Sequence, residues 1–142
     1  MQPAASALLI VIAMAAACTG ATDPLPAGPL PVAGVWNYSG QVAGASAPLA
    51  GAMEFVSRSA INFSGSADIV EGVGSAQRRL TGPVSGRVTD GVVVDFDVTL
   101  GSVLRRHVAR RVADTLTGSW FALSAGGAAI GTSGPFRAVR RP

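Results

Sequence analysis

The acidic pair Asp95 and Asp97 is the clearest grouping of side chains that could do chemistry in this sequence. Residues two apart in an extended strand project from the same face, so both carboxylates would lie together, opposite Val94, Phe96 and Val98. Two carboxylates a few ångströms apart can perform general acid–base chemistry, as in glycosidases, or hold a cation. The apolar residues lie on the opposite face, which is expected to pack in the core. We therefore favour a solvated outer face for Asp95 and Asp97, where they pair with arginines of a neighbouring strand.

His107 is the only histidine, so a metal site built on several histidines is excluded and a serine triad has one candidate base. Its neighbours Arg105, Arg106 and Arg110 oppose protonation of the imidazole, and no adjacent carboxylate is present to orient it. We therefore expect an ordinary surface or rim histidine rather than a catalytic one.

Motifs for nucleotides and metals are missing. The glycine-rich pieces 72–74 and 126–127 lack the Lys-Ser/Thr of a phosphate-binding loop and are expected to be turns. We predict no cofactor, no metal and no enzymatic activity.

Charge is distributed unevenly along the chain. Residues 18–100 carry four arginines and seven acidic residues, whereas residues 101–142 carry seven arginines and one aspartate. This basic C-terminal third could contact anionic lipid headgroups, or its arginines could pair with aspartates across strands. Nucleic acid is not expected as a partner, because aromatic residues are sparse and residues 1–17 predict export.

Residues 1–17 have the properties of a helical secretory signal peptide. Residues 4–17 form an apolar run without charge that ends in small residues and is too short for a comfortable membrane span. Cys18, the only cysteine, follows directly, and residues 18–31 carry four prolines that predict an extended linker. A lone cysteine in an exported chain cannot form an internal disulfide, and acylation would remove the free thiol.

The segment Ala15-Ala16-Ala17-Cys18 resembles the lipobox of bacterial lipoproteins. The resemblance implies lipid attachment at Cys18 and a protein held in the cell envelope, facing the periplasm or the cell surface. Ordinary cleavage after Ala17 and an uncleaved membrane anchor are the alternatives.

From Val32 onward, apolar residues recur at every second position in short runs separated by turn residues. This pattern predicts one all-β domain over residues 32–142, with about eight strands in an antiparallel up-and-down barrel or meander, or in a sandwich. Asp90-Gly91 predicts a tight hairpin turn. Residues 103–113 fit both helical and strand periodicity, and we favour a strand because valines suit it.

The tripeptide Gly34-Val35-Trp36 resembles the Gly-x-Trp motif that begins the barrel in lipocalins and the wider calycin group. In lipocalins an arginine of the last strand packs on this tryptophan, so the resemblance implies that Arg137 or Arg140 stacks on Trp36. The order of Cys18, spacer, Gly-x-Trp-x-Tyr and a final Phe-x-Ala strand is similar to a recurring type of bacterial lipoprotein, mostly uncharacterised.

Three functions follow as hypotheses. An eight-stranded barrel either fills its interior with side chains or holds one small ligand. We favour binding of an apolar or amphipathic small molecule in the interior, ahead of a filled barrel that acts as an envelope interaction or structural module, and last an enzyme. The residues that would line the ligand, or simply form the core, are Trp36, Tyr38, Phe55, Phe63 and Phe96.

Overall fold

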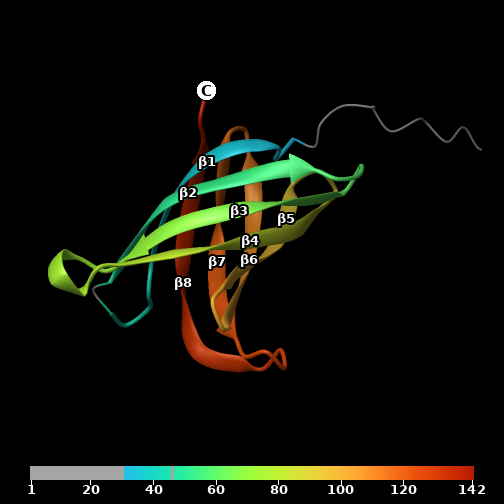
Figure 1. Ribbon diagram of the computed structural model, residues 1–142. Helices are drawn as coiled ribbons and strands as arrows, with labels where there is room; N and C mark the ends of the chain where they lie inside the picture. The colour runs from blue at the N-terminus through green and yellow to red at the C-terminus, as the bar shows by residue number, and fades with distance from the viewer. Residues whose placement is uncertain (1–30, 46) are drawn as a thin grey trace, which may run out of the picture.

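The chain forms a closed antiparallel barrel of eight strands in sequence order, seen in a computed structural model that describes residues 31–45 and 47–142 (Figure 1). The strands are β1 (Gly34–Gln41), β2 (Pro48–Ser57), β3 (Asn62–Glu71), β4 (Arg78–Thr89), β5 (Val93–Leu100), β6 (Val103–Val112), β7 (Thr115–Leu123) and β8 (Ala129–Arg140), with a 3₁₀ turn η1 (Gly74–Ala76) between β3 and β4. The predicted up-and-down barrel is confirmed, and the sandwich is excluded. Over these residues no helix has the length and apolar character needed to span a membrane.

Local sequence patterns predicted several structural elements correctly. Residues 103–112 form strand β6, as favoured over a helix. Asp90 and Gly91 have positive φ values of 51° and 70°, the left-handed conformation expected of a tight hairpin turn, and they lie in the short connection between β4 and β5. The predicted signal peptide, Cys18 and most of the linker lie outside the described residues.

The end of the barrel where β1 begins and β8 ends, called the base here, is plugged. Val32 is fully buried, and its carbonyl accepts a 2.8 Å hydrogen bond from Trp36 Nε1. The Arg140 guanidinium lies 5.2 Å from the Trp36 ring centroid and donates to the carbonyl of Pro31. Arg137, the other residue offered for this contact, faces outward and is exposed, because it stands an odd number of positions from Arg140 on the same strand.

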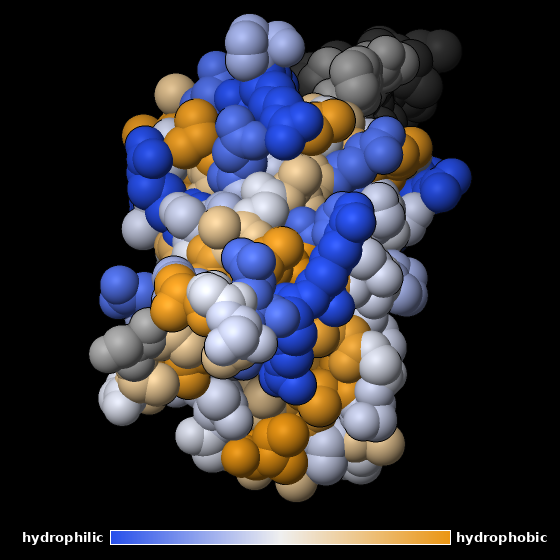
Figure 2. Space-filling view, turned by 60° about the vertical axis from the view of Figure 1, so that its left-hand side comes forward, coloured by the Kyte–Doolittle hydropathy of each residue, from blue (hydrophilic) through white to orange (hydrophobic). Residues whose placement is uncertain are grey.

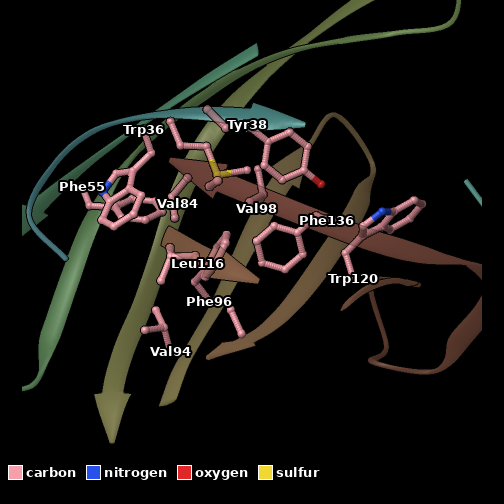
Figure 3. Packing of buried hydrophobic residues seen from close by; sticks show 14 of the residues in the cluster. Trp36, Tyr38, Phe55, Val84, Val94, Phe96, Val98, Leu116, Trp120 and Phe136 are labelled. Carbon is pink, nitrogen blue, oxygen red and sulfur yellow. The ribbon is translucent and has the colours of Figure 1, made fainter. Parts of the chain in front are cut away.

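Aromatic rings fill the barrel above this plug. Phe55 lies 4.8 Å from Phe63 and 5.3 Å from Phe96, measured between ring centroids. Trp36 and Phe55 lie at one side of the cluster, and Trp120 lies at the other (Figure 3). These contacts give one continuous core along the barrel axis.

Strand β6 departs from the usual pattern of apolar residues inward and polar residues outward. His107 is completely buried and Arg105 is 6% exposed, whereas Val108 and Val112 are 43% and 69% exposed. The prediction of a surface or rim histidine is therefore wrong. The reason is register, because His107 pairs with the inward Phe96 on one side and the inward Trp120 on the other.

Inward glycines allow neighbouring strands to cross closely. A Cβ added to Gly65 would lie 1.7 Å from the Glu54 carbonyl oxygen, so backbone occupies the place of a side chain. Such close crossings accompany the strong coiling of small barrels.

We predict that Gly65→Ala destabilises the barrel by about 3 kcal/mol, because the methyl group forces two backbones apart. The matched control is Gly126→Ala, whose added Cβ would meet only Ser124 Oγ at 3.8 Å. Urea unfolding of both variants measures the difference. Equal stability of the two would contradict the close crossing.

Candidate functional site

The end opposite the base, called the mouth here, is where the connections β1–β2, β3–β4, β5–β6 and β7–β8 lie. Three apolar side chains at inward positions form a half-buried rim at this end: Val42, Leu80 and Val103. Leu49 and Leu100 are buried at the same ends of β2 and β5. The rim of the mouth is thus apolar, and Leu49 and Leu100 add apolar side chains just below it.

A charged pair spans the lumen at the mouth. Arg105 Nη2 on β6 donates to Glu71 Oε2 on β3 at 2.5 Å, three strands away around the barrel. The other carboxylate oxygen of Glu71 accepts from Arg78 Nη2 at 3.3 Å. Burial raises the pKa of Glu71, but the hydrogen bonds and charges of both arginines outweigh it and hold that pKa below its ordinary value.

The Arg105 guanidinium is fixed by its neighbours, but not all of its N–H donors are hydrogen-bonded. Its carbon lies 4.6 Å from the centroid of the Trp120 ring, and Trp120 Nε1 in turn donates to the Gln41 carbonyl at 3.2 Å. Its Nε and Nη1 atoms are buried and have no hydrogen-bond partner among the described residues. Unpaired buried donors are costly, so this position is unusual.

Below Arg105, a second polar pair crosses the core. His107 Nδ1 lies 3.1 Å from the Arg105 carbonyl oxygen, and His107 Nε2 lies 3.3 Å from Tyr38 Oη. Because a carbonyl only accepts, Nδ1 carries the proton, and Nε2 accepts from the tyrosine hydroxyl. The imidazole is also stacked on Phe96, with a centroid distance of 4.5 Å. This pair satisfies its own hydrogen bonds inside the core.

The same pair is poorly suited to proton transfer near neutral pH. Burial lowers the pKa of His107 to about 3, against the opposing effect of its hydrogen bond to the Arg105 carbonyl. Burial also raises the pKa of Tyr38, and the charge of Arg105 only partly offsets that rise. Both groups are therefore neutral at pH 7, with neither poised as a general acid or base.

The five aromatic residues named from the sequence all lie inside the barrel: Trp36, Tyr38, Phe55, Phe63 and Phe96. Each is at most 3% exposed and contacts another ring of the core. Their packing fills the base and the middle of the barrel.

The carboxylate pair on β5 faces the outer wall. Asp97 accepts hydrogen bonds of 2.8 and 2.9 Å from Arg106, and Asp95 stands opposite Arg87 in the register. They border a shallow hollow of about 500 Å³ on the outside of β4, β5 and β6. In the part of the chain that the structure describes, no three His, Cys, Asp or Glu side chains gather as a metal site would require.

Sequence reasoning missed three residues of the mouth: Glu71, Arg105 and Trp120. The available signal was that Arg105 and His107 share one face of their strand and that Glu71 shares the face of the apolar Ile69. A charged residue in line with core residues marks an inward polar group. No local pattern says that the two meet across a lumen.

Comparison with known proteins finds similarity only in the fold. No protein-family model matches the chain, and no curated protein matches it. Among solved structures it is similar to EF1p2_mFAP2b bound to DFHBI, with 15% identity, a TM-score of 0.64, and coverage of 79% of this chain and 94% of the other. The chain shares that closed-barrel fold.

Two further barrels match similarly. A fluorescence-activating β-barrel designed de novo is 14% identical with a TM-score of 0.60, over 77% of this chain and 93% of its own. The redesigned barrel mFAP1 bound to DFHBI is 15% identical with a TM-score of 0.60, over 78% and 95%. At this identity the likeness shows architecture alone.

The buried His107 should make stability fall as the solution becomes mildly acidic. In the unfolded chain the imidazole binds a proton below its ordinary pKa of 6.5, whereas the folded protein resists protonation down to a pKa of about 3. We predict a loss of about 2 kcal/mol of unfolding free energy between pH 7 and pH 5, measured by urea denaturation. His107→Gln should remove most of this loss, and the same pH dependence in both proteins would contradict the assignment.

Proposed function

We propose that this protein is an exported, lipid-anchored, non-catalytic barrel that binds an apolar or amphipathic small molecule at its mouth. The observation that carries the proposal is the half-buried apolar rim of Val42, Leu80 and Val103 above a buried guanidinium with unpaired donors. Ligand sites are typically apolar concavities with a few convergent polar groups.

The mouth is the better end for a ligand because the base is closed. Val32, Trp36 and Arg140 seal the base, and the aromatic core occupies the middle. Barrels of this size hold at most one small ligand. Two similar barrels are described as bound to the small molecule DFHBI, which supports the same use of this architecture.

The proposed address follows from the residues before the barrel. Cys18 would carry the lipid, and residues 18–31 would link it to the base, where Pro31 contacts Arg140. This connection would attach the linker at the base, the end opposite the mouth. Arg110 and Arg141 are exposed near the base, where anionic headgroups would contribute attraction of about 1 kcal/mol per charge.

A filled barrel that acts through its outer wall is the second candidate. The exposed Val108 and Val112 alternate with Arg106 and Arg110 along β6. Figure 2 shows that hydrophobic and hydrophilic residues are interspersed over one face of the molecule. Such a wall would suit contact with another envelope component.

We predict that Val103→Ser weakens binding of the apolar dye Nile red about fivefold, because the rim loses apolar surface that would contact the dye. Dye fluorescence titrated with the purified full chain measures this. Val108→Ser is the matched control, since it changes a valine of the same strand on the outer wall. Absence of dye binding, or equal effects of the two substitutions, would favour the filled barrel.

We also predict that Cys18→Ser abolishes lipid attachment. Intact mass spectrometry of the protein from bacterial membranes should show acyl chains on the parent protein and none on the variant, which should move to the aqueous phase on detergent partitioning. An unlipidated parent protein with the same partitioning as the variant would defeat the anchor.

A further inference from the structure

We infer that the ligand of the mouth is an anionic amphipath, a carboxylate on an apolar body, whose charged group binds Arg105. This inference rests on the proposed function and specifies its ligand class. Its basis is the set of hydrogen-bond donors and charges that the barrel leaves unmatched at the mouth.

Arg105 has more hydrogen-bond donors than partners. A guanidinium carries five N–H donors, of which Nε supplies one and Nη1 supplies two. These three have no partner among the described residues, although Arg105 is only 6% exposed. Only Nη2 is engaged, by Glu71. An acceptor-rich group placed here would satisfy donors that the protein itself leaves open.

Arg105 and Arg78 both pair with the same carboxylate. Glu71 is the one carboxylate that pairs with Arg105 in the described residues, and it is shared with Arg78. The neighbouring Tyr38 and His107 are both neutral at pH 7, because burial raises the pKa of the first and lowers that of the second. Two guanidinium groups therefore share one carboxylate, and the mouth attracts an anion.

The shape of the surroundings selects the rest of the ligand. The guanidinium is backed by the flat Trp120 ring, which orients its planar fork, and a carboxylate matches that fork with two parallel hydrogen bonds. Val42, Leu80 and Val103 offer apolar contact to whatever extends from the carboxylate toward solvent. A small inorganic anion would leave this rim unused.

Glu71 would compete with such a ligand. Its carboxylate occupies part of the same guanidinium and repels a second negative charge. Replacing it by glutamine keeps a hydrogen-bond acceptor while removing both the repulsion and the stronger competitor. The variant Glu71→Gln should therefore bind an anionic ligand more tightly, the reverse of what loss of a ligand contact would do.

The test compares decanoate with decanol, which have chains of the same length and differ in the charged group. By isothermal titration calorimetry on the purified full chain at pH 7, we expect decanoate to bind at least about tenfold more tightly than decanol. Arg105→Gln should remove that preference. The matched control Arg106→Gln changes the adjacent, exposed arginine of the outer wall and should preserve it.

The outcomes separate this inference from the proposed function. Equal affinities for decanoate and decanol would overturn the anionic class and leave small-molecule binding intact. Weaker decanoate binding by Glu71→Gln would also overturn it. Binding of neither probe, together with no effect of Val103→Ser on the dye, would remove the proposed function itself. If Arg105→Gln fails to fold by circular dichroism, the parent protein and Glu71→Gln still decide.

Discussion

Closure of the hydrogen-bonded ladder between β1 and β8 is the constraint on which the rest of this structure depends. Every strand then has a partner on both edges, so its register is set twice and no edge remains to pair with another chain. Because side chains alternate along a strand, this register also decides which residues enter the lumen. The contact of Arg140 with Trp36 at the base follows directly, since the two residues are partners across the closing pair of strands.

The same constraint forces a polar group into the interior. Strand β6 has to align His107 between Phe96 and Trp120, and this brings Arg105 inward as well. The barrel accommodates the histidine completely, through Tyr38 and a backbone carbonyl. It accommodates the arginine only in part, through Glu71 and the Trp120 ring. A buried ion pair is weak evidence for stability, and this one leaves Nε and Nη1 of Arg105 without a hydrogen-bond partner among the described residues.

The strength of local signals varied with position. The alternation of Val94, Phe96 and Val98 predicted a half-buried strand, and Asp90-Gly91 predicted the turn before it, because both properties belong to short stretches of backbone. Alternation was uninformative in β6, where each face mixes apolar residues with arginine. In β6, hydrophobicity does not indicate which face of the strand points inward. The pairing of β6 with β5 and β7 determines which side chains enter the lumen.

By itself, the sequence determined the all-β class, the positions of the strands and the aromatic residues available for the core, because these follow from side-chain period and turn chemistry. It also carries the predicted lipid-attachment site at Cys18, which involves no fold. Only the tertiary structure decided that Arg105 meets Glu71, 34 residues away, and that Arg140 rather than Arg137 lies on Trp36. The physical reason is that contacts across a lumen depend on the number of strands and their stagger. The strand number and the stagger are fixed only when all eight strands pair and the barrel closes.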